Sequence, residues 1–334
     1  MFRTFALSLA LVLSAPVLAD QASKILDELV LPGFADLATS SAVMADVAQA
    51  DCTAASEPLR VAYATAFDAW IGVSHLRFGP TETENRGFAL AFWPDSRSST
   101  PKTLSALIAS QDPVVDDTEA FRSVSIAGRG FYALEYLLYD DRLNALGDES
   151  YRCALVQAIA RDIADTSHAM NRDWLVRYAD EMRTPRKGGV YQTRDEVLQE
   201  LYKALDTGLQ INSDLRLGRP LGTFDRPRPR RAEAWRSGRS LRHVQISLER
   251  VHALAGLLAA GNAQLSQVLD VKFETALRKV DALDDPDFAG VATPAGHFRV
   301  EALQQVINDI HTEVTHSLGP ELGVSVGFNS LDGD

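Results

Sequence analysis

The stretch that decides the fold occupies residues 128–138 and reads Gly128-Arg129-Gly130-Phe131-Tyr132-Ala133-Leu134-Glu135-Tyr136-Leu137-Leu138. After its two glycines it is strongly apolar, which is typical of a buried helix. Tyr132 and Glu135 are three positions apart, so a helix places both side chains on one face. Burying the charge of Glu135 is costly without a partner, and this position is therefore a candidate functional site.

Helical periodicity continues on both sides of this stretch. Apolar residues recur at three- or four-residue steps, and no comparable run alternates with a period of two. The pattern predicts an all-α protein. The main predicted helices lie within residues 59–73, 131–138, 155–163, 197–209, 244–257, 265–277 and 303–310.

Breaks rich in proline and glycine separate the predicted helices. Pro32 and Gly33 predict an interruption near the start of the chain, and residues 79–99 predict a long polar loop. A further break at residues 216–231 ends in the run Arg-Pro-Arg-Pro-Arg-Arg. We interpret this run as a stiff, solvated linker, and an anion-binding patch is the alternative.

The domain boundary is expected in the break at residues 183–192, which contains Pro185 and two glycines. This division gives an N-terminal helical bundle at residues 20–185 and a C-terminal helical bundle at residues 190–334. A single larger bundle is the alternative.

The first residues are typical of an export signal. Arg3 supplies the positive start, residues 5–13 an apolar run, and Val17 with Ala19 a small-residue pattern that predicts cleavage between Ala19 and Asp20. The run is shorter than the roughly 20 residues that span a bilayer. We therefore expect a signal peptide at residues 1–19, a periplasmic location and no transmembrane segment in the mature chain; a retained N-terminal helix is the alternative.

Charge and cysteine content narrow the classes of function. The formal net charge is −12, which argues against nucleic acid as a partner. The chain has two cysteines, Cys52 and Cys153. An oxidising compartment permits a disulfide between them, and two buried free thiols are the alternative.

Common catalytic motifs are missing from the sequence. It contains no His-Glu-x-x-His zinc motif, no nucleophile elbow and no phosphate-binding loop. No two of its histidines are four residues apart. These absences leave the Tyr132 and Glu135 segment as the most informative candidate.

That segment resembles the signature of the imelysin family, Gly-x-His-x-x-Glu, with Gly130 and Glu135 matching and Tyr132 standing where the signature has histidine. Other segments resemble family motifs in the same order along the chain. They are residues 70–80, Trp93-Pro94-Asp95, residues 232–241 around Trp235, and the C-terminal residues 322–334. The resemblance extends from about residue 25 to residue 334.

The resemblance implies an exported, all-helical protein with two helical-bundle domains and a functional site in the cleft between them. Relatives in the family include a metallopeptidase-like member and iron-regulated or iron-uptake proteins. The candidates for metal or ligand binding are Tyr132, Glu135, His75, Arg77, Arg129, Arg239, Asn329 and Asp332. The candidates for lining the cleft are Trp70, Trp93 and Trp235.

Tyr132 changes the chemistry that the signature suggests. A neutral phenol is a poor zinc ligand, whereas a phenolate oxygen suits ferric iron. The structural alternative pairs Glu135 with an arginine such as Arg77 or Arg129 and makes Tyr132 an aromatic of the core or cleft wall; an organic-ligand site is the third interpretation.

Three functions follow from these interpretations. The favoured one is binding of a metal or small ligand in connection with iron or haem acquisition, with iron as the expected metal and an outer-membrane or iron-uptake component as a partner. The alternatives are a zinc metallopeptidase and a non-catalytic scaffold or interaction protein. No complete catalytic constellation is present in the sequence, so we favour a protein that is not an enzyme, with a metallopeptidase as the alternative.

Overall fold

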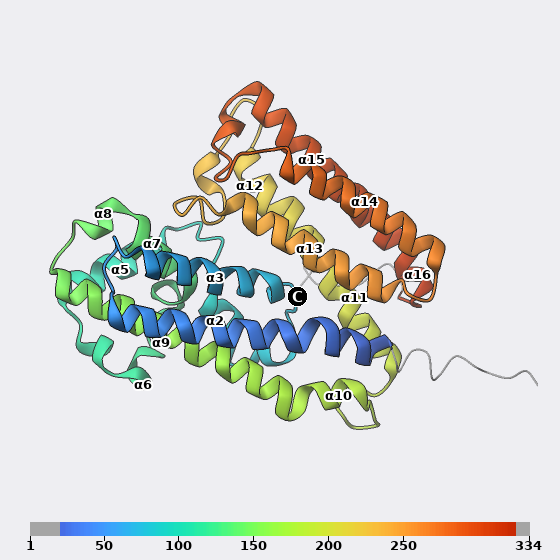
Figure 1. Ribbon diagram of the computed structural model, residues 1–334, viewed down its shortest axis with the longest axis horizontal. Coiled ribbons are helices and arrows are strands. Elements are labelled where there is room, and N and C mark those ends of the chain that lie inside the picture. The colour runs from blue at the N-terminus through green and yellow to red at the C-terminus, as the bar shows by residue number, and fades with distance from the viewer. Residues whose placement is uncertain (1–20, 325–334) are drawn as a thin grey trace, which may run out of the picture.

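The computed structural model describes residues 21–324, and helices make up almost all of its regular structure (Figure 1). Within this range the β pairing consists of one isolated bridge between Thr223 and Arg226. The all-α fold is therefore confirmed. The predicted cleavage site at Ala19 and Asp20 and the C-terminal candidates Asn329 and Asp332 lie outside the described residues.

The first half of the chain forms a group of helices around α2 (Leu31–Ala50). This helix packs along both α3 (Glu57–Val73) and the long α9 (Glu149–Asp173). Helix α7 (Gly130–Tyr139), which carries Tyr132 and Glu135, packs against α9 as well. The remaining elements of this half are η1 (Leu26–Val30), η2 (Gly79–Thr81), η3 (Thr83–Asn85), α4 (Arg86–Leu90), α5 (Ser99–Ser110), η4 (Pro113–Asp116), α6 (Thr118–Phe121), η5 (Ile126–Gly128), α8 (Asp141–Asn144), η6 (Trp174–Tyr178) and α10 (Ala179–Arg183).

The second half forms a group of long helices around α13 (Ser240–Leu258). This helix packs against α11 (Arg194–Gln210) and α14 (Ala263–Asp281), and α14 packs in turn against α15 (Pro294–Glu313). The shorter elements are η7 (Ile211–Leu217), α12 (Gly218–Leu221), η8 (Pro229–Arg231), η9 (Ala289–Ala292), η10 (Val314–Leu318) and α16 (Gly319–Glu321).

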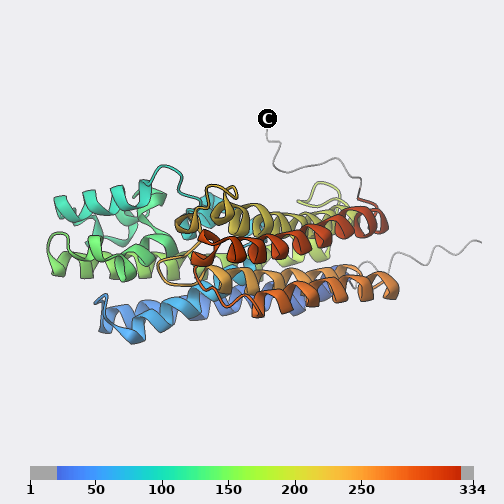
Figure 2. The ribbon, with the colours of Figure 1, turned by 90° about the horizontal axis from the view of Figure 1, so that it is seen from above.

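The two groups meet where α3 packs against α13. Seen from above, the long helices of both groups run roughly along the long axis of the molecule (Figure 2). Buried apolar side chains form one continuous cluster that includes residues of both groups. Residues 184–193 connect α10 to α11, and the predicted boundary at residues 185–190 within this connection stays a prediction.

Side chains at the helix starts explain why several helices begin where they do. The Ser56 hydroxyl accepts the Leu59 N–H before α3, and the Asp148 carboxylate accepts the Ser150 N–H before α9. The Thr193 hydroxyl accepts the Glu196 N–H before α11. Each bond satisfies an amide that has no partner within its helix, which is worth about 1 kcal/mol.

The predicted interruption at Pro32 is wrong, because the helix runs without a break from residue 21 to residue 50. A π-helical turn at Leu26–Val30 directly precedes the proline. The wider hydrogen-bonding pattern of a π turn accommodates a residue that lacks an N–H and whose ring crowds the preceding turn. The breaks at residues 79–99 and 216–231 are partly helical, since they contain η2, η3 and α4, and α12 and η8 respectively.

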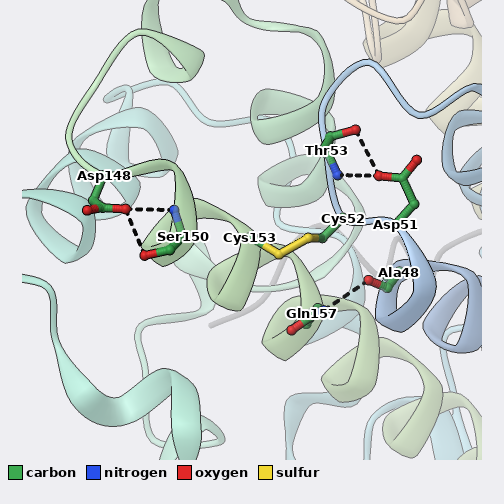
Figure 3. The surroundings of a disulfide bond; sticks show 8 residues. All are labelled: Ala48, Asp51, Cys52, Thr53, Asp148, Ser150, Cys153 and Gln157. Carbon is green, nitrogen blue, oxygen red and sulfur yellow. Dashed lines mark hydrogen bonds between the residues drawn. A yellow bond between two sulfur atoms is a disulfide. The ribbon is translucent and has the colours of Figure 1, made fainter.

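A disulfide joins Cys52, just after α2, to Cys153, near the start of α9 (Figure 3). Their Cα atoms are 5.1 Å apart. Beside the bond, the Gln157 side-chain amide donates a hydrogen bond to the carbonyl of Ala48 over 3.2 Å. Of the two possibilities that the sequence left open, the structure adopts the disulfide.

Among residues 21–324, no helix is both long and apolar enough to cross a bilayer.

Candidate functional site

Helix α7 is positioned by the unusual backbone of its first residue. Gly130 has a φ of +74°, a conformation that side-chain-bearing residues rarely adopt. A Cβ atom at this position would lie 2.3 Å from the carbonyl oxygens of both Ala89 and Leu90. Glycine therefore lets α7 begin directly against the end of α4, which fixes where Tyr132 and Glu135 point.

Tyr132 contacts the second half of the chain through a buried hydrogen bond. Its hydroxyl donates to Oε1 of Glu233, a residue just before α13. The other carboxylate oxygen of Glu233 accepts a 2.6 Å hydrogen bond from Nε of Arg216. Both members of this ion pair are almost fully buried. Tyr132 and Glu135 thus lie beside residues that are distant in the sequence.

The electrostatics of this pair keep Glu233 charged and Tyr132 neutral. Against the effect of burial, the Arg216 guanidinium holds the pKa of Glu233 well below its usual range. Burial and the neighbouring carboxylate raise the pKa of Tyr132 well above its usual value. Tyr132 is therefore a protonated phenol that donates a hydrogen bond, and the phenolate ligand for iron that the sequence suggested does not fit this arrangement.

A histidine and an asparagine surround the ion pair. Nδ1 of His243 lies 3.1 Å from Oε2 of Glu233, and burial lowers the pKa of His243, so the ring is neutral at pH 7. Asn212 accepts a 3.2 Å hydrogen bond from Arg216. The centre of the molecule thus holds one buried charge pair surrounded by neutral polar groups.

Glu135 is also buried, but its partner is a serine. Its Oε1 atom accepts hydrogen bonds from the backbone N–H of Ser237 at 3.0 Å and from the Ser237 hydroxyl at 2.8 Å. Burial raises the pKa of Glu135, and the two bonds from Ser237 oppose that rise.

The suggested arginine partners of Glu135 are wrong, because each of them pairs with another carboxylate. Arg77 pairs with Glu82 at 2.6 Å. Arg129 forms two hydrogen bonds with Asp162, at 2.9 and 2.6 Å. Arg239 pairs with Asp68 on α3. These pairs help to hold the helices in place and leave Glu135 to the Ser237 amide.

Tyr132 and Glu135 lie in the wall of a hollow of about 700 Å³, which we call the central cleft. Its volume is within the range of small-molecule sites, roughly 300–1,000 Å³. Four segments contribute to it: the loop before α5, helix α7, the start of α8, and the segment from α12 to Arg236. Its lining residues are Phe92, Trp93, Asp95, Ser96, Ser98, Thr100, Tyr132, Glu135, Tyr136, Tyr139, Asp140, Asp141, Arg142, Arg219, Arg230, Arg231, Ala232, Ala234, Trp235 and Arg236.

Aromatic rings and arginines contact one another in the wall of the cleft. Trp93 stacks on Tyr132 with 6.4 Å between ring centroids. The guanidinium of Arg236 lies 3.7 Å from the ring centroid of Tyr136 and 4.5 Å from that of Trp235. Nε of Arg236 also donates a 3.0 Å hydrogen bond to Asp140. Such walls suit planar, polar organic molecules.

Among residues 21–324, five of the predicted site residues do not line the cleft: His75, Arg77, Arg129, Arg239 and Trp70. Arg239 lies beside Asp68, as described above. His75 is buried, and burial with the nearby Arg216 and Arg250 charges lowers its pKa to about 3. Trp70, on α3, is buried in the hydrophobic core of the protein. His75 is in the turn that follows α3, and burial keeps both side chains away from the open surface of the cleft.

A metal held by side chains alone does not fit this site. The Tyr132 hydroxyl donates to Glu233, and Glu135 accepts from Ser237. Among residues 21–324, no group of three or more His, Cys, Asp or Glu is placed to hold a metal ion. Catalytic zinc takes about three protein ligands, and the central cleft does not supply them.

Most of the cleft wall that lies between residues 219 and 236 was not predicted from the sequence. Glu233 and Arg216 were not among the candidates, and Arg230 and Arg231 belong to the run interpreted as a solvated linker. Arg226, Arg230 and Arg231 are exposed, as expected of a solvated linker. The run also folds back over α12, where the Arg228 N–H donates to the Pro220 carbonyl over 2.8 Å. The high arginine content of residues 226–231 was the sequence signal that could have identified this wall. It was the basis of the alternative interpretation of the run as an anion-binding patch.

Known proteins resemble this chain in both sequence and fold. The family described as Imelysin matches residues 30–314. Iron-regulated protein A of Synechococcus elongatus is 24% identical over 308 residues, which cover 84% of this chain and 80% of that protein.

Two solved structures share the fold. An imelysin-like protein from Psychrobacter arcticum has a TM-score of 0.75 at 19% identity and covers 96% of this chain and 100% of its own. A protein from Parabacteroides distasonis described as an iron-regulated protein A precursor has a TM-score of 0.68 at 14% identity, covering 90% and 96% respectively. At these identities the likeness concerns the fold.

Proposed function

Since this chain belongs to the imelysin family, we propose that it is an exported, periplasmic protein that binds a small organic ligand in the central cleft in connection with iron acquisition. The observation that carries the proposal is the cleft itself. It has the volume of a ligand site and is lined by two tryptophans, three tyrosines and five arginines. The buried Tyr132–Glu233–Arg216 chain of hydrogen bonds forms a rigid base beneath it.

The connection with iron rests on the relatives. The proteins from Synechococcus elongatus and Parabacteroides distasonis carry iron regulation in their names. In this chain, iron would enter the cleft as part of an organic complex, because Tyr132 is already bound to Glu233 and Glu135 to Ser237. The organic part of the ligand would then contact the aromatic wall.

The same geometry argues against the metallopeptidase alternative. Tyr132 replaces the nitrogen ligand of the family signature, and its hydroxyl is protonated and donates to Glu233. Metal-assisted hydrolysis requires a metal with an open water position held by the protein. The residues at the base of the cleft are arranged for hydrogen bonding instead.

A retention experiment tests the proposal. The protein without residues 1–19 would be mixed with ferric citrate, a ferric hydroxamate complex or a ferric catecholate complex and passed through a desalting column, and the retained iron would be measured. We expect near-stoichiometric retention from at least one complex. Failure of all three to bind would contradict the proposed function.

Two variants locate the ligand. Trp93→Ala removes an aromatic wall of the cleft and should weaken the binding of the retained complex about fivefold, which corresponds to about 1 kcal/mol of aromatic contact. Phe224→Ala removes an exposed aromatic that does not line the cleft, and should leave affinity within about twofold. Equal affinities of the two variants would place the ligand elsewhere.

A further inference from the structure

We propose that the central cleft selects ligands that carry several carboxylate charges, and that Arg142, Arg219, Arg230 and Arg231 recognise those charges. We call these four residues the arginine rim. The inference rests on the proposed function, since it names the chemical class of ligand for the same cleft. All four side chains line the cleft.

The arginine rim is not neutralised by the protein around it. Within residues 21–324, none of its four members forms an ion pair within 4.0 Å. Arg236 differs, because it is paired with Asp140. In a chain of net charge −12, a cluster of unpaired arginines is a local exception to the overall acidity.

Within the described part of the chain, Arg219 is the member of the arginine rim that has a buried hydrogen-bond donor without an acceptor. Its Nε atom is buried and has no hydrogen-bond acceptor among the described residues. Burial lowers the pKa of Arg219, and the neighbouring positive charge of Arg231 lowers it further, because the two cations repel each other. A bound anion beside the two guanidinium groups would relieve that repulsion.

The carboxylates of the cleft do not substitute for such an anion. Asp95 accepts the backbone N–H groups of Ser99 at 2.9 Å and Thr100 at 2.8 Å. Asp140 is bound to Arg236, and Glu135 is bound to Ser237. Asp141 remains, on the exposed start of α8. Three of the four acidic side chains therefore form hydrogen bonds within the walls of the cleft, and the arginine rim lines the space between those walls.

Aromatic contacts orient two of the arginines for planar ligands. The Arg219 guanidinium lies 5.7 Å from the ring centroid of Trp93, and that of Arg230 lies 5.7 Å from the ring centroid of Trp235. A guanidinium that rests on a ring keeps its edge N–H groups available, and these match the two oxygens of a carboxylate. Several such groups around 700 Å³ fit an organic polycarboxylate better than a single small anion.

Calorimetric titration with matched ligands tests the inference. The probes are citrate, ferric citrate, inorganic phosphate, and trimethyl citrate, which keeps the citrate skeleton and removes its charges. We expect citrate or ferric citrate to bind at least about tenfold more tightly than the neutral ester, because charge-assisted hydrogen bonds exceed neutral ones by about that factor. Citrate should also bind more tightly than phosphate, because a single small anion cannot contact several arginines around the cleft at once. Equal affinity for citrate and its ester would overturn the inference.

Matched arginine variants test the assignment of residues. Arg219→Gln and Arg231→Gln should each weaken citrate binding about tenfold and reduce its dependence on salt. Arg226→Gln changes an exposed arginine of the same loop that does not line the cleft, and should keep affinity within about twofold. Circular dichroism would verify that all three variants fold. Unchanged affinity in both rim variants would overturn the inference.

The results also separate this inference from the proposed function. Arginine-dependent binding of citrate with no preference for the ferric complex would support the polycarboxylate class and contradict the connection with iron. Binding of a neutral iron complex, unaffected by Arg219→Gln, would support the proposed function and overturn the arginine rim.

Discussion

At the scale of single residues, the buried ion pair of Arg216 and Glu233 should contribute strongly to the free energy of unfolding. Each charge is acceptable in the interior because the other is 2.6 Å away. Glu233→Gln leaves the Arg216 charge without its counterion, and we expect a loss of about 3 kcal/mol in the free energy of unfolding at pH 7. Denaturant unfolding measures it, with the exposed Glu249→Gln on α13 as a control that should change little.

The same pair predicts how stability depends on pH. The folded-state pKa of Glu233 lies below its usual value of 4.5, so its contribution is fully present above that pH and is lost as the pH falls further. Between about pH 5 and pH 3, the wild type should therefore lose more stability than Glu233→Gln. Parallel pH profiles of the two proteins would contradict this account.

Residue types in the sequence indicated only part of this chemistry. Tyr132 and Glu135 were identified because their spacing places both on one face of a helix with an apolar surround. The partner of Glu135 could not be predicted in the same way. Sequence patterns reveal charged side chains such as Arg77 and Arg129, but the decisive donor is the backbone N–H of Ser237. A main-chain group acquires that position only through the folding of another segment.

At the scale of elements, the start of α7 depends on Gly130. Gly130→Ala would force a side chain into a left-handed conformation and place its Cβ atom against two carbonyl oxygens of the backbone. We expect a loss of about 3 kcal/mol or more, since the conformation costs about 1–2 kcal/mol and the clash adds to it. Denaturant unfolding measures the loss.

Gly188 provides the control for this change. It has a φ of +79°, and a Cβ atom there would meet nothing within 4 Å. Gly188→Ala should therefore show the conformational cost alone, about 1–2 kcal/mol. Equal losses in the two variants would mean that the contact between α7 and the end of α4 contributes nothing.

The disulfide fastens the end of α2 to the start of α9. Cys52 and Cys153 are 101 residues apart, and closing a loop of that length in the unfolded chain is worth about 5 kcal/mol. Reduction with dithiothreitol should lower the free energy of unfolding by about this amount, while the Cys52→Ser/Cys153→Ser variant should not respond. Mass spectrometry that finds two free thiols in the exported protein would contradict the prediction.

The helices themselves were largely predictable, and their ends less so. Stripes of apolar residues such as those at residues 197–209 indicated α11, because burial of one face dictates a period of 3.6 residues. The continuous helix through Pro32 was not predicted, since the sequence does not show that a π turn precedes the proline. The path of residues 226–231 was missed for a similar reason, because it depends on contacts with α12 rather than on local preference.

At the scale of the whole molecule, export stays a prediction of the sequence. The Arg3, apolar-run and Ala19 pattern indicates cleavage before Asp20. Mass spectrometry of protein isolated from a periplasmic extract should give a chain that begins at Asp20. A cytosolic protein that retains residues 1–19 would contradict both the cleavage and the proposed location.

The central cleft was predictable in outline, as a site that α7 shares with the second half of the chain. Its chemistry was not, because Trp93 and Tyr132 belong to the first group of helices, whereas Arg219, Arg230 and Arg231 belong to the second. The packing of the two groups against each other, including that of α3 on α13, brings these side chains together. No local sequence pattern predicts that two groups of helices so distant in the chain pack against each other.

The disulfide also gives the chain the topology of a lasso. The closed ring contains α3 to α8, and therefore one wall of the central cleft, whereas the segment from Arg219 to Arg236 belongs to the open tail. A protease that makes a single nick between Cys52 and Cys153 would leave the polypeptide in one covalent piece. A single nick beyond Cys153 would instead release a fragment, so the two walls differ in how they survive proteolytic damage.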